Sequence, residues 1–364
     1  MMSIVIGLGV VLVVAILYMI FRIGSLVGLV KGKEGKGKEG RVDSYNRMNA
    51  FMFMVFSFCS IGGFLWYSIV HFERYTLPIA SDIGEVTDHL FWITMAITVF
   101  AFVIISIIMF WFTYKYQYNE NRRAEFISDN HKLEIIWTIV PAIVLALLIF
   151  RGLRAWNDIT SPAKADAEVI ELVGQQFAWM ARYPGVKDKQ LGLVNYRLTD
   201  ASNEFGLDLT DKNSFDDFKS LTLHLPVGKE VLLKIRAKDV LHSVFLPHFR
   251  VKMDAVPGMI TQFKFTPTKT TQQMRDELGN PKFNYEMACA EICGKGHFSM
   301  RFPVVVDELE DYEKWKASQD SWLKQNPDYL KRVPAELREA AMIKAGLPLE
   351  STGVGASVRT VSAN

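Results

Sequence analysis

Residues 289–300 read Cys-Ala-Glu-Ile-Cys-Gly-Lys-Gly-His-Phe-Ser-Met. The side chains in this stretch that could bind a metal are those of Cys289, Cys293, His297 and Met300. Thiolate, imidazole and thioether groups are soft or borderline ligands, which together suit copper better than magnesium or calcium. An extended chain would hold the two cysteines about 13 Å apart, so a shared metal requires a compact loop. Gly294 and Gly296 favour such a loop, because glycine adopts backbone conformations that strain other residues.

Other interpretations of these residues remain open at this point. Two nearby cysteines in an oxidising compartment commonly form a disulfide, although this would not explain His297 and Met300. Two cysteines and two histidines could instead form a closed zinc site, which has little use for Met300. His242 lies far upstream, near a β-like run. It could close the metal site from a neighbouring strand, or it could be an ordinary buried histidine.

Four apolar stretches before residue 154 are long enough to cross a bilayer, which requires about 20 helical residues. They cover residues 2–22, 50–70, 91–114 and 135–153. The loops after the first and third stretches are basic, whereas the loop after the second is acidic. Basic loops are cytoplasmic by the positive-inside rule, so the chain after residue 154 is predicted to lie outside the cytoplasm. The first stretch could instead be a cleaved signal peptide, but it lacks a basic start.

From about residue 167 the pattern changes to short β-like runs, separated by turn signals such as Pro184-Gly185 and Pro257-Gly258. Many short strands of this kind predict an antiparallel sandwich or barrel. The polar and acidic segment 195–219 indicates a surface excursion. After residue 307 the chain becomes charged and helix-like, and the last fourteen residues have a composition typical of disorder.

The composition limits the other classes of function. The chain has 364 residues and a net charge of +2, and no basic tract is dense enough to predict nucleic-acid binding. It contains no C-x-x-C-H sequence, so no covalently attached c-type haem is expected in this chain. The third cysteine, Cys59, lies in an apolar run and is interpreted as an ordinary buried residue.

Four stretches carry a resemblance to a known family. Residues 289–300 resemble the signature of the dinuclear copper A site of cytochrome c oxidase subunit II, in the haem–copper oxidase family. Residues 239–243 (Asp-Val-Leu-His-Ser) and 251–258 (Val-Lys-Met-Asp-Ala-Val-Pro-Gly) are similar to the upstream half of that signature. Residues 133–142 (Leu-Glu-Ile-Ile-Trp-Thr-Ile-Val-Pro-Ala) are similar to the start of the family's second membrane helix.

The apolar stretches and the helix-like end of the chain predict an α-helical membrane anchor of about four transmembrane helices and a helical C-terminal tail. Between these parts, the resemblance implies an all-β cupredoxin-like Greek-key sandwich holding two copper ions. It implies that the copper ligands are His242, Cys289, the backbone carbonyl of Glu291, Cys293, His297 and Met300. Both cysteines would bridge the two ions. His242 and Met300 would complete one copper, and His297 with the Glu291 carbonyl would complete the other. The Glu291 side chain would help to hold a magnesium ion shared with subunit I.

The chain is then predicted to divide into five parts. These are two additional N-terminal membrane helices (1–70), the subunit II membrane hairpin (71–155), the copper A domain (156–306), a helical tail (307–350) and a disordered end (351–364). The additional helices and the tail could dock the subunit against a neighbouring respiratory complex.

The implied function is that of the subunit through which electrons enter a proton-translocating oxidase. The copper pair would accept electrons from cytochrome c, either free or as a domain of a neighbouring complex, and pass them to haem in subunit I, which reduces oxygen to water. Subunits I and III and the lipid bilayer would be its partners in the bacterial inner membrane, with the copper domain on the periplasmic side. A membrane-tethered copper-delivery protein and a structural subunit with a degenerate site remain as other classes.

Family position also points to three residues outside the ligand set. Glu134 is a candidate entrance of a proton pathway, although its spacing alone indicates an interfacial carboxylate. The family has a Gln-Trp-aromatic-Trp stretch whose first tryptophan receives the electron, and this chain reads Gln-Phe-Ala-Trp over residues 176–179. Phe177 and Trp179 are therefore candidate electron-transfer aromatics, and equally two aromatic residues of a sandwich core.

Overall fold

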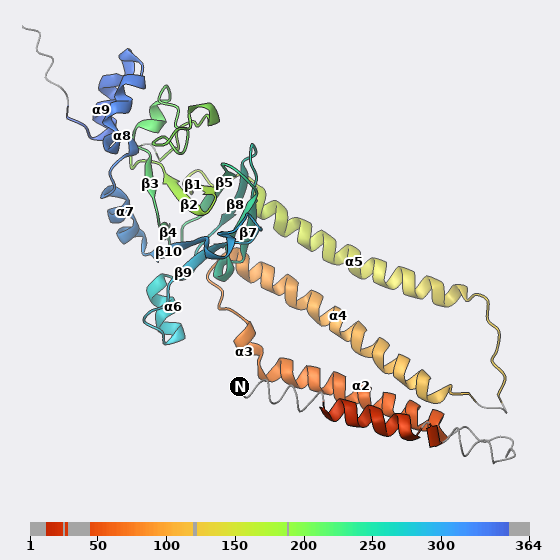
Figure 1. The fold of residues 1–364 in the computed structure, drawn as a ribbon. Coiled ribbons are helices and arrows are strands. Elements are labelled where there is room, and N and C mark those ends of the chain that lie inside the picture. The colour runs from red at the N-terminus through yellow and green to blue at the C-terminus, as the bar shows by residue number, and fades with distance from the viewer. Residues whose placement is uncertain (1–11, 25, 28–43, 119–121, 188, 349–364) are drawn as a thin grey trace, which may run out of the picture. The chain divides into compact units, whose positions relative to one another are not determined.

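The computed structural model describes residues 12–24, 26–27, 44–118, 122–187 and 189–348 (Figure 1). It falls into two units. One combines Met1–Thr76 with Trp92–Leu145, and the other combines Leu77–Phe91 with Ala146–Asn364. The first unit contains most of the apolar helical chain, and the second contains the β-rich outer domain together with the ends of two membrane helices.

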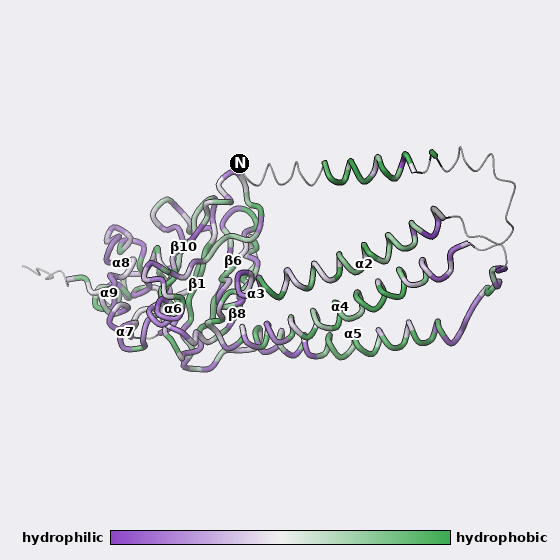
Figure 2. Tube along the Cα trace, turned by 90° about the horizontal axis from the view of Figure 1, so that it is seen from below, coloured by the Kyte–Doolittle hydropathy of each residue, from purple (hydrophilic) through white to green (hydrophobic). Residues whose placement is uncertain are grey.

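Three helices in the described residues are long and apolar enough to cross a membrane. They are α2 (Ser44–Val70), α4 (Asp82–Lys115) and α5 (His131–Thr160). Figure 2 shows hydrophobic residues along much of each one. Each helix covers one of the last three predicted spans, and each extends beyond its apolar run. The first predicted span, 2–22, lies partly outside the described residues, and its described part belongs to the apolar helix Leu12–Gly24.

The outer domain is a sandwich of two five-stranded sheets (Figure 1), as predicted. The first sheet has the strand order β3-β2-β1-β5-β8 and the second has the order β4-β10-β9-β6-β7. The strands are β1 (Glu168–Gln175), β2 (Ala178–Tyr183), β3 (Phe218–Ser220), β4 (Leu223–Pro226), β5 (Val231–Ala237), β6 (His242–Leu246), β7 (Val251–Ala255), β8 (Thr261–Phe265), β9 (Tyr285–Cys289) and β10 (Arg301–Asp307).

The remaining elements are short helices. They are α3 (Phe72–Tyr75), α6 (Thr271–Leu278), α7 (Leu309–Ala317), α8 (Trp322–Gln325) and α9 (Arg338–Ala345). Short 3-10 helices are η1 (Tyr196–Leu198), η2 (Lys212–Phe215), η3 (Pro247–Phe249), η4 (His297–Ser299), η5 (Pro327–Arg332) and η6 (Ala335–Leu337).

Both sheets are mixed rather than purely antiparallel. Strand β1 runs parallel to β5, and β4 runs parallel to β10, whereas the other strand pairs are antiparallel. The antiparallel prediction was wrong for these two pairs. Turn residues reveal hairpins, but a parallel pair joins strands that are distant in sequence and leaves no local signal.

The main core lies between the two sheets. Leu172 and Leu233 of the first sheet and Val244 and Val304 of the second are fully buried in it. Strand β1 is buried at five successive residues, from Ile170 to Gly174. Because successive side chains of a strand point to opposite faces, both faces of β1 must be covered.

A second core covers the other face of β1 and β2. Val173 and Met180 from these strands belong to it, together with Phe205, Leu207, Leu209, Phe215, Trp322, Leu323, Val333, Ala341 and Ala345. The segment 205–215 and the C-terminal helices therefore pack together on the first sheet. The tail is helical as predicted, and its helices α8 and α9 are part of the packing of the outer domain.

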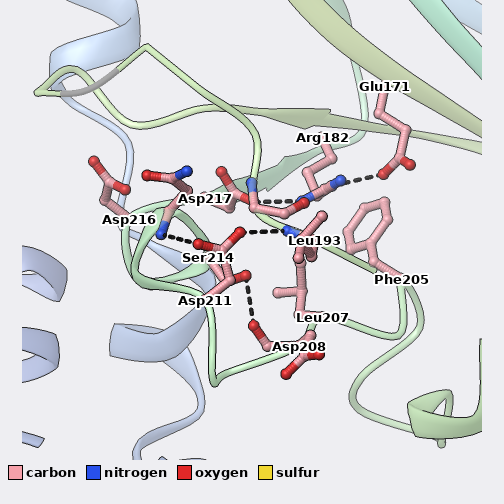
Figure 3. A network of polar contacts seen from close by, with 12 residues as sticks. Glu171, Arg182, Leu193, Phe205, Leu207, Asp208, Asp211, Ser214, Asp216 and Asp217 are labelled. Carbon is pink, nitrogen blue, oxygen red and sulfur yellow. Dashed lines mark hydrogen bonds and ion pairs between the residues drawn. The ribbon is translucent and has the colours of Figure 1, made fainter. Parts of the chain in front are cut away.

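The acidic segment 195–219 is a folded part of the domain, which corrects its prediction as a surface excursion. Its carboxylates hold its own structure (Figure 3). Asp217 and Glu171 are buried on either side of the Arg182 guanidinium. Asp211 accepts a hydrogen bond from the backbone N–H of Leu193 at 2.8 Å, and Asp216 lies 3.0 Å from Lys344 of α9. The apolar residues between these acids supply the second core.

Candidate metal centre

The second sheet brings the predicted metal ligands to one place. Strand β6 begins at His242, β9 ends at Cys289, and β10 begins immediately after Met300. Strands β6 and β9 are neighbours, with Val244 opposite Cys289. The loop that joins β9 to β10 therefore lies beside the first residue of β6.

The six predicted ligand residues converge on the two thiols. Cys289 Sγ lies 3.9 Å from Cys293 Sγ, 3.9 Å from His242 Nδ1 and 3.2 Å from the carbonyl oxygen of Glu291. Cys293 Sγ lies 3.7 Å from His297 Nδ1 and 3.8 Å from Met300 Sδ. The ligand atoms of His242, Cys289 and Cys293 all lie within 4.8 Å of one another. Residues separated by up to 58 positions in sequence thus form one cluster.

The chemistry of this cluster fits a soft or borderline metal ion. Both cysteines are free, and their Sγ separation is far longer than the roughly 2.0 Å of a disulfide bond. His242 is fully buried, and Cys289, Cys293 and Met300 are nearly so. Burial, together with the adjacent Cys289, raises the pKa of the Cys293 thiol to about 11. Two buried thiols, two imidazoles and a thioether form the donor set that copper prefers.

Asp239 and Gln176 support the ligands from outside the cluster. Asp239 Oδ1 lies 2.8 Å from His242 Nε2, and its Oδ2 accepts the backbone N–H of Gln176 at 2.6 Å. The Gln176 side-chain amide donates to the carbonyl oxygen of Cys293 at 2.6 Å. Burial opposes ionisation of Asp239, but these hydrogen bonds outweigh it and lower the pKa of the carboxyl. Asp239 and Gln176 each lie in a motif that is visible in the sequence. The spacing of the motifs does not show that these two residues contact each other, His242 and Cys293.

Trp179 and Phe177 lie against different parts of the cluster. Trp179 is buried, and its ring meets the His242 ring edge to face with 5.8 Å between centroids. Gly174 makes room for this contact, because a Cβ there would lie 2.9 Å from Trp179 Cζ3. Phe177 is 39% exposed. Its ring lies against the ligand loop, where a Cβ on Gly294 would lie 2.9 Å from Phe177 Cζ.

Glu134 lies in the first turn of α5, in the other unit of the structure. Its carboxylate is 3.3 Å from His131 Nδ1, and its side chain is 45% exposed. Glu291 is half-buried and contributes its backbone carbonyl to the thiol cluster. The roles predicted for these two carboxylates, in proton uptake and magnesium binding, stay predictions.

Comparison with known proteins places the chain in a family. Residues 168–309 match the family model for the periplasmic domain of cytochrome c oxidase subunit II, and residues 64–155 match the model for its transmembrane domain. The alternative cytochrome c oxidase subunit 2 of Bradyrhizobium diazoefficiens is 35% identical over 248 residues, which cover 67% of this chain and 84% of the relative. This chain belongs to the cytochrome c oxidase subunit II family.

Other members of the subunit II family are also similar. Cytochrome c oxidase subunit 2 of Metridium senile is 30% identical over 200 residues, covering 53% of this chain and 70% of the relative. The crystal structure of the periplasmic domain of subunit II from Bradyrhizobium japonicum is 25% identical, with a TM-score of 0.28, and the match covers 42% of this chain and 93% of that one. As a subunit II, this chain is part of a haem–copper oxidase, with membrane helices and an external cupredoxin-like domain.

Proposed function

We propose that this subunit II admits electrons to its oxidase through a pair of copper ions held by His242, Cys289, the Glu291 carbonyl, Cys293, His297 and Met300. The observation that carries the proposal is the convergence of four donor groups on two free thiols that lie 3.9 Å apart, each donor within 3.2–3.9 Å of one of the thiols. When bound, two copper ions that share two thiolates exchange one electron with little change in ligand geometry. The intact donor set argues against a degenerate structural subunit.

The chain's own residues would divide the work of binding. Cys289 and Cys293 would bridge the two ions. His242 with Met300 would complete one, and His297 with the Glu291 carbonyl the other. The strand ends of β6, β9 and β10 hold these groups in place before the metal arrives. Pre-formed ligands reduce the rearrangement that each change of oxidation state requires.

The path of electrons and protons is the remaining part of the proposal. A cytochrome c, free or part of a neighbouring respiratory complex, would dock where Phe177 is exposed, and Trp179 lies between the sheets beside His242. Electrons would continue to haem in subunit I for the reduction of oxygen, coupled to proton translocation.

Glu134 would admit protons, and the Glu291 side chain would share a magnesium ion with subunit I. Subunit III would complete the complex. The basic loops favour a bacterial inner membrane with the outer domain on the periplasmic side.

Metal counting tests the copper pair directly. The full-length chain, purified in detergent, reduced and supplied with copper, is expected to hold two ions per chain. Its electron spin resonance spectrum should show one unpaired electron shared between them. Cys293→Ser should abolish the shared signal, because it removes a bridging thiolate.

Cys59→Ser is the matched control, since this cysteine is an exposed residue of α2, outside the cluster. It should leave both the metal count and the spectrum unchanged. A single exchangeable copper ion in the wild-type chain would contradict electron transfer through a copper pair and would favour copper delivery.

A further inference from the structure

A carboxylate that is not a metal ligand reaches the centre from the loop before β6. Asp239 lies three residues before His242, and its Oδ1 is 2.8 Å from His242 Nε2. The other ring nitrogen, Nδ1, faces Cys289 Sγ at 3.9 Å. The imidazole therefore stands between the thiol cluster on one side and a carboxylate on the other, and it is fully buried.

We propose that Asp239 is a positioning residue of this centre, which orients His242 toward the metal and joins it through Gln176 to the loop that carries Cys293. The inference rests on the proposed copper site and goes beyond it by assigning a role to a residue outside the ligand set.

The first part of the argument concerns the ring of His242. A neutral imidazole carries its proton on one nitrogen and a lone pair on the other, and a hydrogen bond at one nitrogen selects which tautomer is present. The Asp239 carboxylate accepts a hydrogen bond from the Nε2–H group of His242, which leaves the Nδ1 lone pair directed at the metal. A carboxylate partner also makes the imidazole a stronger donor, which favours the more oxidised state of a bound metal.

The two histidines of the centre differ in this respect. The His297 ring contacts Cys293 Sγ through Nδ1. Among the described residues, no carboxylate forms a hydrogen bond with this ring. Asp239 therefore acts on one imidazole of the pair. Removing it should alter the share of the unpaired electron that each copper carries, as well as the potential.

The second part concerns the link between the sheets. Gln176 lies in the turn between β1 and β2 of the first sheet, whereas His242 and Cys289 belong to the second. Asp239 accepts the Gln176 backbone N–H, and the Gln176 side chain donates to the carbonyl oxygen of Cys293. These two short hydrogen bonds, both of 2.6 Å, hold the turn that carries Phe177 in place. The first joins the turn to the loop before β6, and the second joins it to the ligand loop.

The experiment compares Asp239→Asn and Asp239→Ala with the wild type in the full-length chain. Asparagine keeps the shape of the side chain and removes its charge, and alanine also removes the hydrogen bonds. We expect both variants to lose copper to a competing chelator more readily, by about 10- to 100-fold. We also expect a higher reduction potential and changed copper hyperfine splitting, with the larger change in Asp239→Ala.

Glu286→Gln is the matched control. Glu286 is an exposed carboxylate of β9 that pairs with Arg301 at 3.3 Å, so this variant removes the same charge from a side chain whose ion pair is with an arginine and not with a ligand. Gln176→Ala tests the link by itself, and it should weaken copper retention while leaving the tautomer of His242 unchanged. Circular dichroism of each copper-free variant shows whether the fold is intact.

The outcomes separate this inference from the proposed function. A wild-type chain that binds no copper pair overturns the proposed function. A wild-type chain with the copper pair, and Asp239 variants whose affinity, potential and spectrum equal those of Glu286→Gln, overturn the role of Asp239 alone. If Asp239→Ala does not fold, the comparison of Asp239→Asn with Glu286→Gln decides.

Discussion

The ring of Phe177 lies on the ligand loop, against Gly294 and Gly296. A Cβ added to Gly296 would overlap Cβ and Cγ of Phe177, which belong to the fixed part of that side chain. The small residue at 296 is therefore required by the aromatic ring above it. Gly294 is less informative as a test site, because its φ of +134° strains any other residue there regardless of space.

At this residue scale we predict that Gly296→Ala weakens copper binding, because the loop and the ring can no longer both keep their positions. Gly296→Ala combined with Phe177→Ala should restore most of the lost affinity, since the smaller side chain frees the space. Chelator competition on the single and double variants measures this coupling. Additive losses in the double variant would show that the ring and the loop act independently.

At the scale of elements, Arg182 of β2 connects the first sheet to the acidic segment. Its guanidinium donates to Glu171 of β1 at 2.6 Å and to the carbonyl oxygen of Gly192 at 3.0 Å, and it pairs with Asp217. The side chains of the three charged residues are at most 3% exposed. Each carboxylate is tolerated there because the buried cation lies between them.

We predict that Arg182→Met destabilises the chain by about 3–5 kcal/mol, because it leaves Glu171 and Asp217 buried with less compensation. Urea unfolding followed by tryptophan fluorescence measures the change. Lys324→Met is the control, since Lys324 and Asp320 form an exposed pair at the start of α8 and its loss should cost under about 0.5 kcal/mol. Equal effects of the two substitutions would contradict the network's role.

The elements also show which parts of the structure a sequence can predict. The spacing of Cys289, Cys293 and His297 is local, so the ligand loop is visible as a pattern, and the apolar runs of α4 and α5 are long enough to be read directly. The position of Asp239 against His242 and of Gln176 against Cys293 depends on two sheets meeting. No local pattern carries that information.

The second core was missed for a related physical reason. Its apolar residues are scattered singly among charged ones, as Phe205 and Phe215 are in the acidic segment and Trp322 is in the tail. Neither segment has an apolar face long enough to form a core alone. The available signal was in β1, where Ile170 and Leu172 put apolar side chains on one face and Val173 puts one on the other.

At the scale of the whole molecule, the tail makes the outer domain larger than the predicted boundary at residue 306. We predict that a chain ending at Ala317 is destabilised by roughly 5 kcal/mol, since it loses the buried side chains of Trp322, Leu323 and Val333. Limited proteolysis should then cut within residues 185–217. Cys289, Cys293 and Met300 of the proposed copper site lie in the main core, so copper binding should persist at low temperature.

A chain ending at residue 348 is the control, because it keeps every residue of the second core. Its melting temperature should equal that of the full chain. Equal protease resistance of the two truncated chains would contradict the contribution of α8 and α9.

The second core also has a consequence for the order in which the protein is made. Chains leave the ribosome N-terminus first and fold as they emerge. Phe205 and Phe215 are synthesised roughly a hundred residues before Trp322 and Leu323, so their apolar surface stays uncovered while that part of the chain is made. A polypeptide that stops after β10 would have both sheets complete, but the apolar residues of the second core on the first sheet would be exposed. Quality-control proteases recognise exposed apolar surface of this kind. The helices α8 and α9 thus complete the outer domain only after both sheets have been made.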